Sequence, residues 1–113
     1  MHEMALCEEL VQAIQAQAGS QGFSRVHAVW LEVGALAAVE CDAMRFNFDI
    51  ITKGTLAEDA RLDIMEVDGT AWCMPCATAV KLRRFGDPCP RCEGYQLRVL
   101  DGKQIKIRQL EVT

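Results

Sequence analysis

The chain has 113 residues, half of them hydrophobic, and a formal net charge of −4 at pH 7. This length can bury one hydrophobic core plus one small metal-stabilised module, but hardly two independent domains. No stretch approaches the roughly 18 consecutive apolar residues of a membrane span, and the acidic N-terminal segment lacks the features of a signal peptide, so we expect a soluble, cytoplasmic protein.

The charges are distributed unevenly along the chain. Residues 1–69 carry 12 acidic and 4 basic side chains, a net charge of −8, whereas residues 70–113 carry 4 and 8, a net charge of +4. An acidic protein with an isoelectric point near 5.1 is a poor match to the phosphate backbone of nucleic acids. We therefore expect neither nucleic acid nor a membrane as a partner.

The first half of the chain predicts two helices and a strand between them. Apolar residues recur every three or four positions from Glu3 to Ala18, which is typical of an amphipathic helix, and Gly19 is expected to end it. Val26 to Val33 is almost continuously apolar and rich in β-branched and aromatic residues, so it predicts a covered strand. Glu40 to Thr52 has a helical apolar stripe with acidic residues at its start.

Two more strands are expected, at Arg61 to Val67 and at Ile105 to Val112, the second preceded by an Asp101-Gly102 turn. Between them, residues 70–96 are too few and too cysteine-rich to form their own hydrophobic core. The order of elements predicts an α+β fold with two helices on one face of a three-stranded sheet and an inserted zinc-ribbon module.

Four of the six cysteines form two Cys-x-x-Cys pairs, Cys73 with Cys76 and Cys89 with Cys92. Twelve residues separate the pairs, a distance that one hairpin can span. Four thiolates satisfy tetrahedral zinc without an open position, so we expect a structural zinc site. A redox pair, rubredoxin-like iron or transient disulfides are the alternatives. A closed site leaves no room for substrate and argues against catalysis at this metal.

The N-terminal residues offer a second set of metal donors. His2 is large, so Met1 is expected to be retained with a free amine. This amine, the amide nitrogen of His2 and one imidazole nitrogen would form two fused chelate rings, and Glu3 would supply a fourth donor through its amide or carboxylate. Such a planar set suits Ni(II) or Cu(II). The competing interpretation of a histidine at position 2 is a solvated terminus without a role.

Several short motifs form a joint pattern along the chain. They are Met1-His2-Glu3-Met4, Cys7-Glu8, Val33-Gly34, Gly54-Thr55-Leu56, the two Cys-x-x-Cys pairs and Leu110-Glu111-Val112. Together they resemble the hydrogenase maturation nickel metallochaperone family (HypA/HybF), and the resemblance covers essentially the whole chain. Each motif alone is weak evidence, whereas their combination is specific.

The resemblance implies that the chain inserts nickel into NiFe hydrogenase and catalyses no reaction itself. The implied partners are a nickel-binding GTPase and the precursor of the hydrogenase large subunit. The order of elements and the cysteine content divide the chain into an α+β domain, residues 1–69 together with 97–113, and a zinc-binding module, residues 70–96. The resemblance implies that the first of these domains binds nickel.

The resemblance also assigns the metal ligands. His2 becomes the principal nickel ligand beside Met1, and Glu3 supports the site and docking. Glu40 lies where some relatives place an acidic residue near nickel, and Cys41 departs from the proline expected after that acid. The zinc ligands are Cys73, Cys76, Cys89 and Cys92.

Other residues receive structural interpretations. Cys7 and Cys41 lie on apolar helical faces, where an unpaired cysteine behaves as a small hydrophobe. Trp72, next to a cysteine of the first pair, is expected to shield the zinc thiolates. Lys81 and Arg83-Arg84 are expected to form a solvated basic face, with a docking patch for an acidic partner as the alternative.

The sequence contains no Ser-His-Asp set, glycine-rich phosphate loop or His-Glu-x-x-His motif, so we expect no enzymatic activity. The alternative function is a zinc-ribbon module that binds protein or RNA, with the N-terminal histidine incidental. Stoichiometric nickel binding in addition to zinc would distinguish the two.

Overall fold

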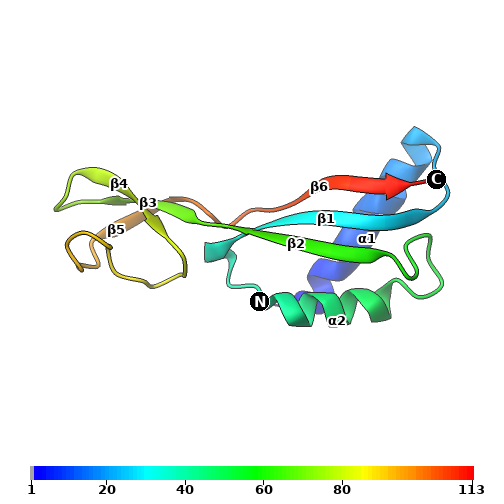
Figure 1. Cartoon of the computed structure of the whole chain (residues 1–113), viewed down its shortest axis with the longest axis horizontal. Helices are drawn as coiled ribbons and strands as arrows, with labels where there is room; N and C mark the ends of the chain where they lie inside the picture. Colours follow the sequence, from blue (N-terminus) through cyan, green and yellow to red (C-terminus); the bar gives the residue numbers. More distant parts are fainter. Residues whose placement is uncertain (1) are drawn as a thin grey trace. The chain divides into compact units, whose positions relative to one another are not determined.

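The computed structural model describes residues 2–113 and confirms the expected α+β class (Figure 1). The described residues form two α-helices, one short 3₁₀ turn and two three-stranded sheets. In chain order, the elements are α1 (Glu3–Gln21), β1 (Val26–Gly34), the 3₁₀ turn η1 (Ala35–Ala37), α2 (Cys41–Ile51), β2 (Arg61–Val67), β3 (Gly69–Cys73), β4 (Thr78–Leu82), β5 (Leu97–Asp101) and β6 (Ile105–Val112).

The chain is divided into two compact units. Unit 1 runs up to Leu31 and includes Val39–Ile64 and Ile107–Thr113, while unit 2 comprises Glu32–Ala38 and Met65–Lys106. Unit 2 therefore contains the whole cysteine-rich segment. The assignment of nickel to residues 1–69 with 97–113, and of zinc to residues 70–96, stays a prediction.

Helix α1 buries the apolar stripe that its periodicity predicts, and its buried members are Cys7, Leu10, Val11 and Ile14. The helix ends at Gln21, so the expected end at Gly19 is wrong. Gly22 caps it with a left-handed backbone (φ 80°), and its amide donates to the carbonyl of Ala18 at 2.9 Å. The left-handed C-cap is the position that strongly favours glycine, whereas a glycine inside a helix is merely less stable than alanine.

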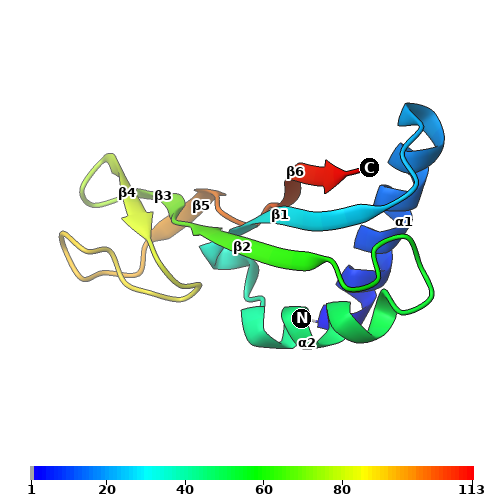
Figure 2. The same ribbon diagram turned by 45° about the vertical axis from the view of Figure 1, so that its right-hand side comes forward.

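The second layer of unit 1 is a sheet with the strand order β2-β1-β6. Helix α1 lies behind this sheet in Figure 1, and α2 packs against α1, as the turned view of Figure 2 also shows. Met44 and Phe48 of α2 are almost completely buried. The buried hydroxyl of Thr52 donates to the carbonyl of Phe48 at 2.7 Å, so the C-terminal end of α2 keeps its polar groups satisfied.

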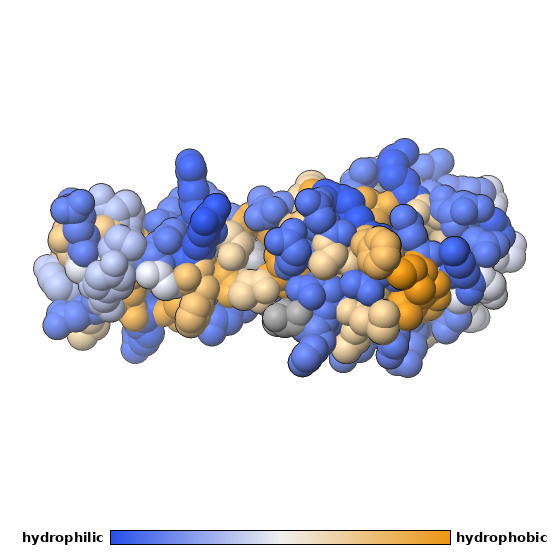
Figure 3. All heavy atoms as spheres, turned by 90° about the horizontal axis from the view of Figure 1, so that it is seen from below, coloured by the Kyte–Doolittle hydropathy of each residue, from blue (hydrophilic) through white to orange (hydrophobic). Residues whose placement is uncertain are grey.

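The outward side of α2 is partly apolar. Phe46 is 67% exposed and Ile50 is 43% exposed. They are four residues apart on the helix and therefore lie on one face. Figure 3, which views the molecule from the side of α2, shows hydrophobic atoms gathered there among hydrophilic ones. Within residues 2–113, neither helix combines the length and the apolar character that crossing a membrane requires.

Unit 2 contains an antiparallel sheet with the strand order β4-β3-β5, and its strands are not among those expected from the sequence patterns. Its inner face packs against Leu36 of η1, and two glycines make room for that side chain. A Cβ atom on Gly69 would lie 2.3 Å from Cδ1 of Leu36, and one on Gly102 (φ 113°) would lie 2.5 Å from Cα of Gly69. The amide of Leu36 donates to the carbonyl of Gly102 at 2.8 Å, which holds η1 against the sheet.

Candidate metal centre

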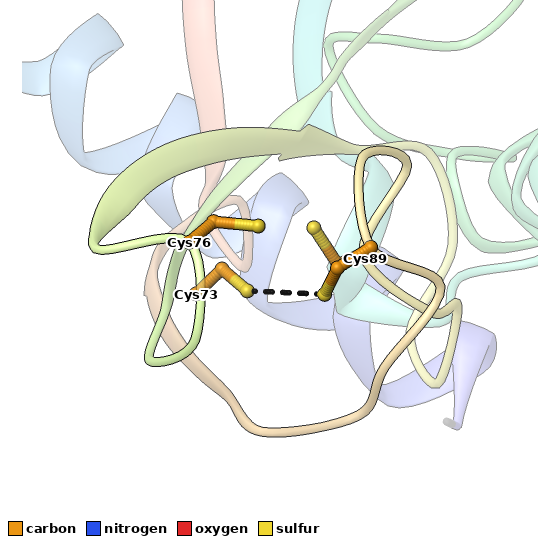
Figure 4. Close-up of side chains that lie close together, drawn as sticks. Cys73, Cys76 and Cys89 are labelled. Carbon is orange, nitrogen blue, oxygen red and sulfur yellow. Dashed lines mark hydrogen bonds between the residues drawn. The ribbon is translucent and has the colours of Figure 1, made fainter.

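The four cysteines of the two Cys-x-x-Cys pairs converge at one place in unit 2. Their sulfur atoms all lie within 4.8 Å of one another, and the Sγ atoms of Cys73 and Cys92 are 3.6 Å apart. Figure 4 shows the sulfurs of Cys73, Cys76 and Cys89 pointing toward a common centre. None of the six cysteines, all of which lie within residues 2–113, forms a disulfide bond in this structure.

The first cysteine pair follows directly from the sheet. Cys73 is the last residue of β3, and a tight turn leads through Cys76 into β4. The amide of Ala77 donates to the carbonyl of Met74 at 3.3 Å and closes this turn. Ala77 itself has a left-handed backbone with φ 51°.

The second pair lies in the connection between β4 and β5. The amide of Cys89 donates to the carbonyl of Gly94, and the amide of Glu93 donates to the carbonyl of Cys89, both at 2.8 Å. Glu93 has φ 60°, so the residue after the second cysteine is left-handed in both pairs. The two loops thus share a left-handed residue directly after the second cysteine, and each carries its two sulfurs toward the cluster.

The geometry fits a tetrahedral metal. Four sulfurs about 2.3 Å from a central zinc ion would be roughly 3.8 Å apart, close to the 3.6 Å between Cys73 and Cys92. The backbone amides of Cys92 and Arg91 lower the pKa of the Cys89 thiol to about 7, which favours the thiolate that a metal requires. The hydrogen bond to Cys73, together with burial, raises the pKa of Cys76 to about 12.

Trp72 does not shield the thiolates, so that expectation is wrong. Successive side chains of a strand point to opposite faces of its sheet. Because Cys73 lies on the inner face, Trp72 lies on the opposite face. On that face, Trp72 pairs across the strands with Ala79 and Arg98. Leu36, Val80 and Leu82 belong to the cluster packed around the cysteines instead.

The predicted nickel-binding terminus is described from His2 onward, and Met1 lies outside the described residues. His2 is exposed and is the N-cap of α1 with an extended backbone (φ −87°, ψ 93°). Its carbonyl accepts the first hydrogen bond of the helix, from the amide of Leu6 at 3.2 Å. The imidazole makes no capping hydrogen bond, so its nitrogens are not used by the helix.

Two of the predicted acidic residues are brought together although 37 positions separate them. One carboxylate oxygen of Glu3 accepts a hydrogen bond from the backbone amide of Glu40 at 3.2 Å. This bond is the main reason why the pKa of Glu3 is lowered. Glu40 in turn caps α2, because its side chain accepts from the amide of Asp42 at 3.2 Å. The starts of α1 and α2 are therefore joined at the residue next to His2.

The two remaining cysteines lie in unit 1. Cys7 is completely buried, and its sulfur lies 3.4 Å from the carbonyl oxygen of Met44 and 3.9 Å from the Met44 sulfur. Burial, reinforced by the nearby charge of Glu3, raises the pKa of Cys7 to about 11. Cys41 is half-buried and opens α2. Neither belongs to the four-cysteine cluster.

Comparison with known proteins identifies the family. The family model for hydrogenase/urease nickel incorporation, metallochaperone HypA, matches residues 1–112. This chain belongs to the HypA family. The hydrogenase maturation factors HypA of Rhodopseudomonas palustris and of Acidithiobacillus ferrooxidans are 51% and 49% identical to it over 112 residues, and each match covers 99% of both chains.

The fold of this HypA-family chain is also similar to a solved structure. The solution structure of the Ni metallochaperone HypA from Helicobacter pylori superposes with a TM-score of 0.71 at 20% identity. That match covers 99% of this chain and 97% of the other. The family is one of metallochaperones, and the similar proteins are hydrogenase maturation factors.

The four cysteines predicted from the sequence of this HypA-family chain come together in the structure, whereas the nickel ligands at its N-terminus stay a prediction. The contacts around both sets of residues were not predicted. The bond from the Glu40 amide to Glu3 is one of them, because contacts between distant residues leave no local pattern. A detectable signal was the acidic residue directly before α2, a position where a side chain can accept from the first helical amides.

Proposed function

We propose that this chain binds Ni(II) at its N-terminus and delivers it during the maturation of NiFe hydrogenase. The Met1 amine and the amide and imidazole nitrogens of His2 form the chelate, and Glu3 completes it. The observation that carries the proposal is the exposed, non-helical His2 at the start of α1, in a chain that matches the HypA family model over residues 1–112. The chelate requires Met1 to be the free terminus of the mature protein.

The backbone at His2 supports this ligand set. Chelation through a backbone amide nitrogen needs a nitrogen that no helical hydrogen bond uses and a backbone that can turn around the ion. His2 precedes the helix with extended dihedral angles, so its amide lies outside the helical hydrogen bonds, which supports this ligand set. Helix α1 also anchors the segment immediately after the chelate, which lowers the ordering cost of binding.

Glu3 and Glu40 have different parts in the proposed site. The carboxylate of Glu3 is already engaged by the Glu40 amide, and this bond ties the first residue of α1 to the residue that caps α2. We therefore assign Glu3 a positioning role through its carboxylate in addition to a donor role. Glu40 stays a subsidiary candidate, because one oxygen of its side chain caps α2.

The metal of the four-cysteine cluster is proposed to be structural zinc. Zinc has no redox chemistry and accepts four thiolates in a closed tetrahedral site. When bound, it supplies charge neutralisation and a cross-link between the two loops that carry the cysteines. The site shares no ligand with the proposed nickel chelate.

The proposed partners are those of nickel delivery: a nickel-binding GTPase and the precursor of the hydrogenase large subunit, in the cytoplasm. The family model names urease as well as hydrogenase. Whether this chain also supplies nickel to urease is tested by the activity of a urease that is coexpressed with it in a nickel-limited host.

The deciding experiment compares the two histidines of the chain. His2→Ala removes the proposed imidazole ligand, whereas His27→Ala alters an exposed histidine whose Nε2 lies 3.0 Å from the Thr113 hydroxyl. Untagged, zinc-loaded proteins are titrated with Ni(II) by calorimetry. We expect His2→Ala to lose tight nickel binding and His27→Ala to keep it. Equal nickel affinity in both variants would contradict the proposal.

A second arm tests the amine of Met1. One residue added before Met1 converts the amine to an amide and removes the first donor of the chelate. The intact mass of each protein establishes its terminus. We expect the extended protein to lose the planar Ni(II) absorbance spectrum while keeping its zinc, and a C-terminal tag to change neither.

A further inference from the structure

Unit 2 carries an apolar groove that neither the zinc site nor the nickel terminus uses. Its volume is about 160 Å³, below the roughly 300–1,000 Å³ of pockets for small molecules and cofactors. Such a groove can hold one large apolar side chain. The residues that form its walls are Leu36, Leu82, Phe85, Tyr95, Leu97 and Val99.

Two aromatic side chains of the groove are unusually exposed. Phe85 is 64% and Tyr95 is 72% exposed, although both line the same apolar surface. Single exposed apolar side chains are common, but two aromatic rings on one apolar groove form the kind of surface that partner proteins bind. Aromatic residues at a pocket are also the type that contributes most to binding energy.

The surroundings of Phe85 are cationic. The ammonium group of Lys103 lies 5.3 Å from the centroid of the Phe85 ring, within the range of a cation–π contact. Arg83 and Arg84, both exposed, directly precede Phe85 in the chain. Asp87 is the one acidic residue that lines the groove. The groove thus combines an apolar floor with one cation in contact with Phe85 and two exposed arginines directly before Phe85 in the chain.

We propose that this groove binds an acidic segment of a partner protein, which inserts one apolar side chain beside Phe85 and Tyr95. Carboxylates that flank the inserted side chain would face Arg83, Arg84 and Lys103, so the charges of the two surfaces complement each other.

This docking function goes beyond nickel binding and needs none of its ligands. None of the residues that form the groove walls or supply its cations is a cysteine of the metal cluster or a residue of the N-terminal chelate. Loss of nickel binding and loss of docking are therefore separable. The His2→Ala variant should bind an acidic partner segment as well as the wild-type protein does.

The test uses the full, zinc-loaded chain and three fluorescent peptides in anisotropy titrations. The first is built from aspartate and glutamate with one central leucine, the second has alanine in place of leucine, and the third has lysine in place of every acid. We expect the first peptide to bind at least about tenfold more tightly than either of the others. Added salt should weaken this binding.

Variants locate the binding surface. We expect Phe85→Ala and Lys103→Glu each to weaken binding of the leucine peptide about tenfold or more. The matched controls are Leu100→Ala, an exposed apolar residue that does not line the groove, and Arg98→Glu, which pairs with Trp72 on the other face of the sheet. Both controls should bind as the wild-type protein does, and zinc content verifies that each variant is folded.

Three results would overturn the proposal. The first is that the leucine peptide fails to bind at about 1 mM, and the second is that Phe85→Ala binds it with unchanged affinity. The third is that an oligodeoxythymidine binds in the groove more tightly than the leucine peptide does. The third result would favour a nucleic-acid surface. Amide chemical shifts of Tyr95, Leu97 and Val99 report whether a probe occupies the groove.

Discussion

At the scale of single residues, the two cysteine loops depend on left-handed backbone conformations. Ala77 and Glu93 follow the second cysteine of their pairs and have φ values of 51° and 60°. A residue with a Cβ atom pays about 1–2 kcal/mol in this region, which glycine largely avoids. Each loop therefore contains one unfavourable backbone conformation. The interactions of its converging cysteines must compensate for this cost.

Replacement of Ala77 by glycine should remove this strain. We expect Ala77→Gly to stabilise unit 2 by about 0.5–1 kcal/mol and to slow the release of zinc to a chelator. Ala79→Gly is the matched control, because Ala79 is an exposed residue in the regular strand β4, where glycine should instead cost about 0.5–1 kcal/mol. Thermal unfolding of the zinc-loaded proteins measures both effects. Destabilisation by Ala77→Gly would contradict the argument.

Cys7 predicts how stability depends on alkaline pH. Its pKa is about 11 in the folded chain and 9.0 as a free thiol, because burial and the charge of Glu3 disfavour the thiolate. The folded state thus retains a proton that the unfolded state loses. This stabilising contribution is complete below pH 9 and is lost as the pH rises from about 9 to 11.

The measurement is urea unfolding at several alkaline pH values. We expect the free energy of unfolding of the wild-type protein to fall more steeply between about pH 9 and 11 than that of Cys7→Ala. Native Cys7 should also react slowly with iodoacetamide at about pH 8, because it is buried and protonated. Equal slopes for the two proteins would show that Cys7 does not titrate as proposed.

At the scale of elements, α2 has one buried and one exposed aromatic side chain. Phe48 is 1% exposed and packs in the core of unit 1, whereas Phe46 is 67% exposed. We expect Phe48→Ala to cost about 3–5 kcal/mol of unfolding free energy and Phe46→Ala about 0.5 kcal/mol or less. Urea denaturation measures both. A large cost at Phe46 would mean that its ring is covered in solution.

The elements also show where sequence patterns succeed. The strands β2 and β6 begin and end at the residues expected from the sequence, because alternation and β-branching are local signals. The end of α1 was predicted wrongly because the sequence offers two glycines, Gly19 and Gly22, as possible C-caps. Only the left-handed backbone at Gly22 decides between them.

At the scale of the whole molecule, the cysteine cluster and the buried face of α1 and α2 belong to different compact units. Unit 1 has its own core, with Ile14, Leu31 and Phe48 among its fully buried side chains. The core of unit 2 is small and includes two of the cysteines themselves. Removal of the metal should therefore affect unit 2 far more than unit 1.

Cys76→Ala tests this expectation. We expect the variant to release its zinc and to lose the dispersed amide signals of β3, β4 and β5, while the signals around Phe48 persist. Cys7→Ala, which removes a cysteine outside the cluster, should keep its zinc. Metal analysis and a two-dimensional amide spectrum report the outcome. Full zinc occupancy in Cys76→Ala would contradict the four-cysteine assignment.

The sequence by itself determined the α+β class, both helices, the three strands of the unit 1 sheet and the two cysteine pairs. Each of these is encoded by spacing within a short stretch: 3.6-residue periodicity, alternation, or the repeated Cys-x-x-Cys motif. The family resemblance, built from motifs along the whole chain, was confirmed by the match over residues 1–112.

Only the tertiary structure decided which distant residues meet. In the folded chain, β3, β4 and β5 form one sheet, and Trp72 lies on the face of that sheet away from the thiolates. Glu3 accepts a hydrogen bond from the Glu40 amide, and Leu36 packs against the cysteine cluster. The physical reason is that strand register and side-chain packing depend on the shapes of surfaces far apart in the chain. Local sequence patterns do not contain information about these surfaces. The groove beside Phe85 could therefore not be predicted from the sequence.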